Sequence, residues 1–273
     1  MEKDKEPQMD INNENYYSKE ADMEYMSASQ FKGFMKCEAR QKAILTGEFI
    51  PTDTTALLQG RLLETLLLEP DKIEQFRNEN PELFSQKGAN KGDLKYEFKK
   101  VQEMADRAKQ DNFFMSYLGD PFSTLYQYPV TGEIAGIKFK GLLDIYQPQS
   151  CIVDLKGIKD FQPIWDNSIN KKLNFIEYWG YHTQLAVYQW LVKQNTDKIL
   201  PVFIAGITKE TVSDIGIFSI PQEILDHQLS VIGELAPRYQ KIKDGEIEPV
   251  RCECCDYCKT TKELNTVVNL FDY

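Results

Sequence analysis

The chain has 273 residues, and a hydrophobic content of 42% is ample for the core of one large domain or two small ones. Its net charge of −10 argues against simple nucleic-acid binding, because proteins that contact many phosphates usually carry a basic surface. No apolar run approaches the length of a membrane span, and the first five residues do not resemble a signal peptide. The composition therefore predicts a cytoplasmic protein that does not enter a membrane.

The beginning of the chain differs in character from the rest. Residues 1–24 are polar and acidic, and we expect them to form a flexible arm ahead of a single domain that spans 25–273. The first helix of that domain is predicted to begin near Ser27, in a capping box with Gln30, and to continue through Cys37.

The pattern after this helix alternates between helical and strand-like segments. A leucine-rich helix is predicted over 55–68, a turn-rich loop over 69–93 and another helix over 95–116. The remaining predicted elements are a strand block over 123–155 with a turn region at 131–136, a helix over 174–193, strands over 200–208 and 213–220, and a helix over 221–243. This order predicts an α/β fold with a central mixed sheet flanked by helices.

Two acids and a lysine lie at the ends of two predicted strands. Residues 138–146 and 151–155 are apolar and are separated by a short turn. If these strands pair, Asp144 lies beside Asp154, and Lys156 points the same way as Asp154 because strand side chains alternate faces. Two carboxylates and one ammonium then meet at the end of a sheet, a grouping that holds a hard cation on oxygen ligands.

Two predicted helices carry residues that fit the same site. Gly60 and Glu64 are four residues apart on one helix face, and a glycine there lets another backbone approach closely. Leucines surround Glu64, so a buried acid with a metal partner is more natural than an unpaired one. Gln184 and Tyr188 share a face of their helix by the same spacing, where they either pack on the sheet or face DNA.

The order of these pieces along the chain resembles that of the PD-(D/E)XK nuclease superfamily, in its RecB-like and phage-exonuclease branch. The motifs span roughly residues 27–220 and read Gly60-x-x-x-Glu64, Gly141-x-x-Asp144, Asp154-x-Lys156 and Gln184-x-x-x-Tyr188. The resemblance implies a restriction-endonuclease-like core in which Lys156 is catalytic, and Gln184 and Tyr188 contact the substrate. It also implies that Mg²⁺ or Mn²⁺ is held by Glu64, Asp144, Asp154 and the Leu155 carbonyl. Many RecB-like members have His where this chain has Glu64, whereas lambda-type exonucleases have Glu.

The same resemblance implies an activity and partners. It implies a metal-dependent exodeoxyribonuclease, similar to exodeoxyribonuclease VIII, that resects duplex DNA ends in phage or prophage recombination inside a bacterial host cell. A single-strand annealing protein and a homo-oligomeric ring are implied as well, and a ring would help to explain how an acidic chain holds DNA. Two alternatives are a CRISPR-type adaptation nuclease and a catalytically silent DNA-binding scaffold of the same fold. The intact Asp154-x-Lys156 motif argues against the scaffold.

Basic and aromatic residues near these motifs have two interpretations each. The basic residues either form a solvated face or contact DNA. They are Lys32, Lys36, Arg40 and Lys42 on the first helix, and Lys156, Lys159, Lys171 and Lys172 from the acidic motif onward. Trp165 follows Lys156 closely and either anchors a loop or stacks on a base.

Four of the six cysteines fall within residues 252–258, which in a cytosolic chain favours metal ligation over disulfides. Cys252, Cys255 and Cys258 need a fourth ligand, for which Cys37 is the candidate, and their spacing alone favours zinc. One cysteine before the nuclease motifs and three after them resembles the AddB-type helicase–nucleases and the CRISPR adaptation nucleases. That resemblance implies a [4Fe–4S] cluster, with Zn²⁺ as the alternative.

Overall fold

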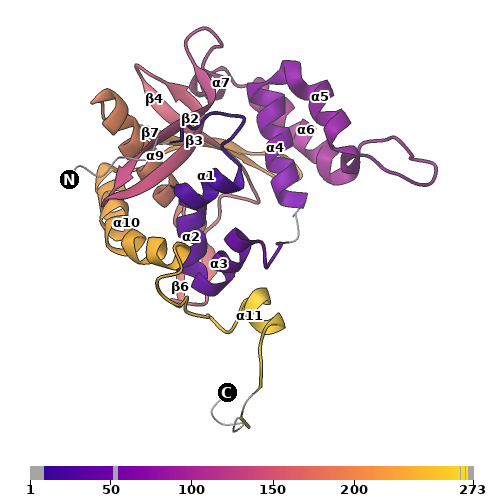
Figure 1. Ribbon diagram of the computed structural model, residues 1–273. Helices are drawn as coiled ribbons and strands as arrows, with labels where there is room; N and C mark the ends of the chain where they lie inside the picture. The colour runs from indigo at the N-terminus through magenta and orange to yellow at the C-terminus, as the bar shows by residue number, and fades with distance from the viewer. Residues whose placement is uncertain (1–8, 52–54, 265, 268, 270–273) are drawn as a thin grey trace.

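A six-stranded mixed sheet forms the centre of the computed structural model, which describes residues 9–51, 55–264, 266–267 and 269 (Figure 1). The strands are β1 (Met26–Ser27), β2 (Leu125–Ile134), β3 (Ile137–Gln147), β4 (Cys151–Ile158), β7 (Val202–Thr208) and β8 (Ile215–Ser219). Their order is β1-β3-β4-β7-β8, with β2 on the other edge of β3. The β1–β3 and β4–β7 pairs are parallel and the others antiparallel. The predicted α/β fold with a mixed sheet is confirmed.

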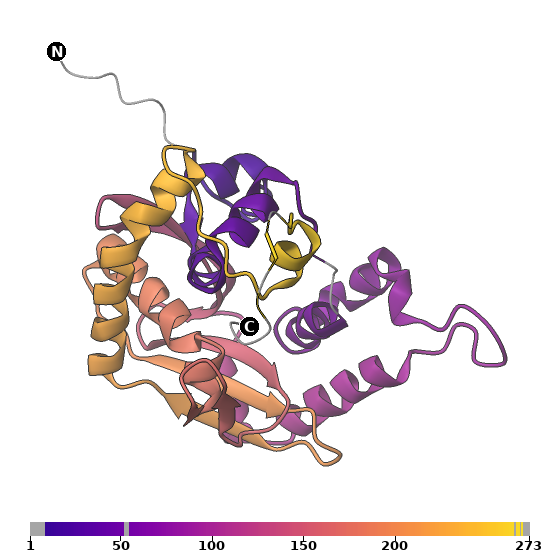
Figure 2. The same cartoon turned by 90° about the horizontal axis from the view of Figure 1, so that it is seen from below.

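Helices cover both faces of this sheet (Figures 1 and 2). Side chains of β4 alternate between two apolar cores, so that Ile152 enters one core and Val153 the other. The first core lies against α2 (Ala28–Lys36), α9 (Tyr181–Thr196) and α10 (Gln222–Lys243). The second lies against α4 (Thr55–Leu68), α6 (Tyr96–Lys109) and α7 (Asn112–Leu118). The leucine-rich helix therefore has the predicted bounds and packs on the sheet face opposite α9.

Three long predicted helices are each divided in two. Ser27 caps α2 by accepting a hydrogen bond from the Gln30 N–H, but α2 ends at Cys37, whose extended backbone begins α3 (Glu38–Thr46). Asp111 ends the next helix and caps α7 by accepting from the Phe114 N–H. The third divides at Gly180 into α8 (Phe175–Tyr178) and α9. The side chains of Cys37 and Asp111 cap the helices that follow them, whereas at Gly180 a left-handed backbone with φ of 64° separates the two helices.

The stretch predicted to loop out over 69–93 is helical in its first half, so the prediction was wrong there, and it forms a loop from 84 onward. It contains the short helices η1 (Pro70–Lys72), α5 (Ile73–Glu79) and η2 (Pro81–Leu83). Phe76 and Leu83 are buried in the core beneath α4 and α6, and this packing orders a segment whose sequence is polar. Only the segment between η2 and α6 extends as an open loop, which projects from the body in Figure 2.

The beginning of the chain is also more ordered than the sequence suggests. Residues 1–8 lie outside the described part, but 9–24 are not a flexible arm, because Ile11, Tyr16 and Ala21 are buried. Helix α1 (Lys19–Glu24) begins at Ser18, which caps it. The buried Lys140 of β3 donates to the Tyr16 carbonyl and pairs with Asp22 at 2.8 Å, which fastens this segment to the sheet.

Three smaller elements complete the described chain. β5 (Ile164–Asp166) and β6 (Lys171–Leu173) form a separate hairpin that carries Trp165. The short helix α11 (Asp256–Thr260) lies in the cysteine segment near the C-terminus, close to α3. No helix within the described residues is both long enough and apolar enough to cross a membrane.

Candidate active site

The candidate site lies where β3 and β4 separate. Ile145 and Val153 are the last paired residues of that ladder, and the next residue on each strand is an aspartate. Asp144 and Asp154 are both buried, with 7% and 1% of their surface exposed. The Leu155 N–H donates to Asp144 Oδ2 at 3.0 Å, which fixes one carboxylate against the opposite strand. The structure thus places the two aspartates side by side, as pairing across the turn predicts.

Lys156 joins the two aspartates. Its Nζ lies 2.8 Å from Asp154 Oδ2 and 3.5 Å from Asp144 Oδ2. Asp154 and Lys156 occupy alternate positions of β4 and therefore face α9 together. Within the described residues, Asp154 Oδ2 accepts no hydrogen bond beyond this ion pair, so one buried carboxylate oxygen retains capacity for another ligand.

Helix α9 supports Asp154 from the side. Gln184 Nε2 donates to Asp154 Oδ1 and to the Tyr188 hydroxyl, both at 3.0 Å. Tyr188 is buried, and its ring packs so closely on Gly141 that a Cβ added there would lie 2.9 Å from it. These contacts give Gln184 and Tyr188 a role in holding Asp154, and direct contact with a substrate stays a prediction for both.

Glu64 approaches the same point from α4. Gln127 Nε2 donates to Glu64 Oε2 at 3.5 Å, and Gln127 holds a left-handed backbone with φ of 48° on β2. No motif identifies Gln127, because its contact with Glu64 arises only when β2 and α4 pack near each other. The expected close backbone approach at Gly60 was wrong, since a Cβ added there would meet no described atom within 4 Å.

Burial and charge repulsion shift the ionisation of these groups. Burial raises the pKa of Glu64 to about 7, with Lys156 opposing the shift and Asp154 adding to it. Burial also raises the pKa of Asp144 well above its usual range, and the neighbouring carboxylates add to this effect. Burial alone would lower the pKa of Lys156, but Asp154, Asp144 and Glu64 outweigh it and raise that pKa. The site holds more carboxylates than its single ammonium neutralises.

These donors fit a divalent cation. Glu64, Asp144 and Asp154 supply oxygen ligands in a poorly hydrated position, and oxygen ligands are what Mg²⁺ and Mn²⁺ bind. A cation would stabilise the charged form of Glu64 and Asp144 against the burial and the smaller charge repulsion that raise their pKa values. Within the described residues, only a group of four cysteines brings three or more His, Cys or carboxylate ligand atoms within 4.8 Å of one another, so metal binding by Glu64, Asp144, Asp154 and the Leu155 carbonyl stays a prediction.

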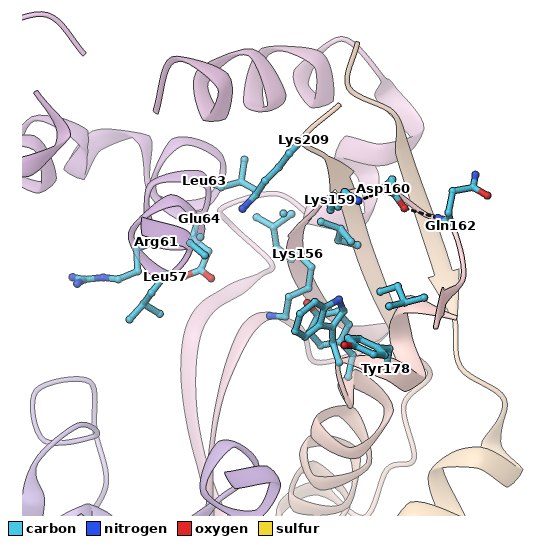
Figure 3. Close-up of a pocket in the computed structure, with 18 of the residues that line it drawn as sticks. Leu57, Arg61, Leu63, Glu64, Lys156, Lys159, Asp160, Gln162, Tyr178 and Lys209 are labelled. Atoms are coloured by element: carbon cyan, nitrogen blue, oxygen red, sulfur yellow. Dashed lines mark hydrogen bonds and ion pairs between the residues drawn. The ribbon is translucent and has the colours of Figure 1, made fainter. Parts of the chain in front are cut away.

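Two cavities meet at this site. The larger, of about 810 Å³, lies between α4 and the segment of α8 and α9, and Figure 3 shows Glu64 on one side of it and Lys156 and Lys209 on the other. The smaller, of about 450 Å³, is bounded by the N-terminal segment, α2 and α3. Glu64 and Lys156 line both cavities, so the catalytic candidates stand between two accessible spaces.

The four cysteines predicted to share one centre do lie together. The Sγ atoms of Cys37, Cys252, Cys255 and Cys258 are all within 4.8 Å of one another. Three of these sulfurs accept backbone N–H bonds: Cys37 from Arg40, Cys252 from Cys255, and Cys255 from Cys258. The group fastens the start of α3 to the C-terminal segment, and thiolates held by backbone donors suit a metal ion.

We expect a pH effect on the stability of the metal-free protein. The pKa of Glu64 is raised from 4.5 to about 7 on folding, so its contribution is complete below pH 4.5 and is lost as pH rises through 7. In chelator, wild type should lose stability between pH 5 and 8, by a few kcal/mol at most from this group. Glu64→Gln should reduce that loss, as urea unfolding at several pH values would show.

The control for this prediction is an exposed acid on the same side of the fold. Glu74→Gln, on α5, removes a carboxylate whose partner Arg77 is at the surface, and should leave the pH dependence unchanged. Equal pH profiles for wild type and Glu64→Gln would contradict the buried position of Glu64.

Comparison with known proteins agrees with this geometry. The family model described as a PDDEXK-like domain of unknown function (DUF3799) matches residues 27–261. A crystal structure from Eubacterium rectale, described as that of a "putative exonuclease", is 38% identical, covers 97% of this chain and 98% of its own, and superposes with a TM-score of 0.88. The structure of SSO0001 is 15% identical and covers 67% of this chain and 86% of its own, but its TM-score of 0.28 is too low to support a conclusion about fold or function. No curated protein matches the sequence.

The family match covers the strands and helices that hold Glu64, Asp144, Asp154 and Lys156. It agrees with the motif order and with the mixed sheet, and so confirms the resemblance to PD-(D/E)XK nucleases. The chain belongs to the DUF3799 family of PDDEXK-like domains.

Proposed function

We propose that this protein is a metal-dependent deoxyribonuclease that acts on DNA ends. The observation that carries the proposal is the packing of Asp144, Asp154 and Lys156 at the parting of two strands, with Glu64 close enough to affect their ionisation. The Eubacterium rectale protein, described as an exonuclease, supports action at an end rather than within a strand.

Each residue has a distinct task in this proposal. Glu64, Asp144 and Asp154 would hold Mg²⁺ or Mn²⁺, which when bound activates water and neutralises phosphate charge. Lys156 is held beside the carboxylates in its charged form, so its ammonium can donate to a phosphate oxygen as negative charge develops there. Gln184 fixes the orientation of Asp154 through its amide and thereby keeps the carboxylate in one rotamer.

The overall charge of −10 does not oppose this proposal once the site is considered locally. Bound cations would offset the carboxylates, and cations already line the larger cavity, among them Arg61, Lys159 and Lys209. Assembly into a ring would supply further contacts, and hand-over of the remaining strand to an annealing protein in phage or prophage recombination follows from the family resemblance. Size-exclusion chromatography with light scattering tests the ring.

The direct test is digestion of end-labelled linear and covalently closed circular DNA with Mg²⁺, with Mn²⁺ and with chelator. We expect linear DNA to be degraded from its ends only when a divalent cation is present, and circular DNA to survive. Cutting of circular DNA would replace the exonuclease proposal by an endonuclease. A lack of cutting in every condition would favour the alternative of a silent DNA-binding scaffold.

We also propose that the cysteine group holds one zinc ion. The sulfur of Cys258 lies 3.6 Å from that of Cys37 and 3.9 Å from that of Cys252. Tetrahedral zinc with Zn–S bonds of about 2.3 Å separates its sulfurs by roughly 3.8 Å. A [4Fe–4S] cluster places four irons and four sulfides between its ligands and needs a wider spacing. The observed separations therefore support zinc over the cluster that the resemblance implies.

A further inference from the structure

The larger cavity is bordered by cations that the catalytic proposal leaves unused: Lys209 lines it, and Lys32 lies outside its lining, against Trp179 and Tyr181 of its wall. Lys32 of α2 is half-buried, forms no ion pair within the described residues, and donates only weakly to the Trp179 carbonyl at 3.5 Å. Its ammonium lies 5.8 Å from the centre of the Tyr181 ring, and that of Lys156 lies 5.7 Å from the same ring. Two cations thus approach one aromatic residue of the cavity wall, and one of them lacks a counter-ion.

The absence of a side chain at Gly180 leaves space for the Lys32 side chain. Gly180 links α8 to α9 with φ of +64°, and a Cβ added there would lie 2.9 Å from Lys32 Cδ. Burial and the nearby charge of Lys156 lower the pKa of Lys32 to about 8. Partial burial of an ammonium that pairs with no acid among the described residues is unfavourable, and an anion would relieve it, so the position suits a phosphate.

Lys209 provides a second such group across the cavity. It follows β7, is half-buried, and forms no ion pair in the described part of the chain. Its ammonium donates to Gln59 Oε1 of α4 at 2.7 Å, which directs it towards the cavity, as Figure 3 shows. The one aspartate on this wall, Asp160, is engaged elsewhere, because it accepts from the Gln162 N–H and pairs with Lys159.

Aromatic rings complete the wall between these cations. Tyr178 and Trp179 end α8 with their rings edge to face, 5.0 Å apart at 88°, and both line the cavity. Trp179 is 46% exposed, so a large flat surface stays open to the cavity. An indole beside ammonium groups is the combination that binds a base and its phosphate in single strands.

The smaller cavity suits a nucleotide less well. Three carboxylates line it, those of Asp22, Glu64 and Asp144. Two lysines line this cavity, the catalytic candidate Lys156 and Lys140. Lys140 already pairs with Asp22 at 2.8 Å. The phosphate-binding side of the site is therefore the larger cavity.

We propose that this cavity binds an unpaired nucleotide of the strand being cut, with Lys209 on its phosphate, Trp179 against its base and Lys32, beside the cavity, on an adjoining phosphate of the same strand. The inference rests on the proposed function and adds the substrate form, a strand whose last nucleotide is separated from its partner. Trp165, which the sequence offers as a base-stacking residue, lies on the β5–β6 hairpin and does not line the cavity.

The test is equilibrium binding in Ca²⁺ of a 12-nucleotide oligo(dT) and of a blunt duplex, followed by anisotropy and by tryptophan fluorescence. Binding of oligo(dT) should quench wild-type fluorescence, and Trp179→Phe should abolish most of the quenching. Trp179→Ala should weaken binding about tenfold or more. Trp165→Phe and Trp165→Ala, which alter a tryptophan of similar exposure (49%), are the matched controls and should leave quenching and affinity unchanged.

Salt dependence tests the lysines separately. Lys32→Ala and Lys209→Ala should each lower the slope of log affinity against log salt by about 0.7, the value for one single-strand phosphate contact. Lys36→Ala, on the same helix but exposed, should leave the slope unchanged. Two results would overturn the subsite. One is that oligo(dT) still quenches fluorescence in Trp179→Phe and that both lysine variants keep the wild-type salt slope; the other is that wild type binds only the blunt duplex. Failure of wild type to bind either DNA would instead overturn the proposed function.

Discussion

Asp154→Asn is expected to abolish divalent-cation-dependent DNA cleavage, with a loss on the order of a thousandfold or more, while the protein stays folded. Asparagine keeps the size of the side chain and an oxygen that can accept from Gln184, but it removes the charge that pairs with Lys156 at 2.8 Å. The measurement is single-turnover cleavage of end-labelled linear DNA over a range of Mg²⁺ and Mn²⁺ concentrations, with circular dichroism to verify folding.

Two further variants show whether the loss is specific. Lys156→Ala should also stop cleavage but should retain metal binding, because it removes an ammonium and leaves the three carboxylates. Asp160→Asn is the control, since Asp160 also lines the larger cavity but engages only its own loop and Lys159. A folded Asp154→Asn protein that cuts DNA at the wild-type rate would refute this site, as would a loss of equal size in Asp160→Asn.

Cys37→Ala should release the metal and destabilise the protein by several kcal/mol. Its sulfur lies 3.6 Å from that of Cys258, 221 residues away, so the thiol group closes almost the whole chain into a loop. The binding energy of a structural metal is folding energy, and it disappears with one of four ligands. Metal content by elemental analysis and unfolding in urea measure the two effects, and the wild type should be colourless with one zinc per chain.

Two other cysteines provide controls for this variant. Cys254 is exposed and lies outside the group of four, so Cys254→Ala should keep both metal and stability. Cys151 is buried in the core at the start of β4, so Cys151→Ala should lower stability but keep the metal. Full metal content in Cys37→Ala would show that the four thiols share no ion, and a brown protein with sulfide would show an iron–sulfur cluster in place of zinc.

Ionic contacts and hydrogen bonds also hold α10 and the C-terminal segment to α3. Arg238 makes two hydrogen bonds with Glu38, at 2.7 and 2.8 Å, and Glu38 accepts from the Val250 N–H. Arg40 pairs with Asp256 at 2.8 Å. The Arg40–Asp256 pair is partly exposed, with side-chain exposures of 30% and 57%, whereas Glu38 is only 13% exposed and is held by two bonds from Arg238. We therefore expect α11 to loosen once the cysteine contacts are lost, while Val250 stays held by Glu38.

The sequence indicates much of the site because short-range rules govern it. Asp154 and Lys156 face one way because strand side chains alternate, and the turn before β4 sets the register that brings Asp144 alongside. The leucine pattern of α4 predicts both its bounds and the face that packs on the sheet. Gln184 and Tyr188 are neighbours because four residues make about one helical turn.

Other features follow from contacts between distant segments. The helix expected to run through Cys37 breaks there, since the thiol must reach the C-terminal cysteines more than two hundred residues away. The acidic start of the chain is ordered because Lys140, buried in β3, requires acceptors that Tyr16 and Asp22 supply. Gln127 reaches Glu64 through a left-handed backbone that no local pattern announces.

The sequence by itself therefore determined the order of the main strands and of the helices that flank them, the α/β class and the choice of charged groups for the candidate site, because periodicity and motif spacing are local properties of the chain. The tertiary structure alone decided that Glu64 and Lys156 stand between two cavities, and that Trp179 rather than Trp165 lines the larger one. It also decided that Lys32 is half-buried and pairs with no acid in the part of the chain that the structure describes. Exposure, cavity shape and charge pairing depend on which segments fold against one another, and no single stretch of sequence contains that information.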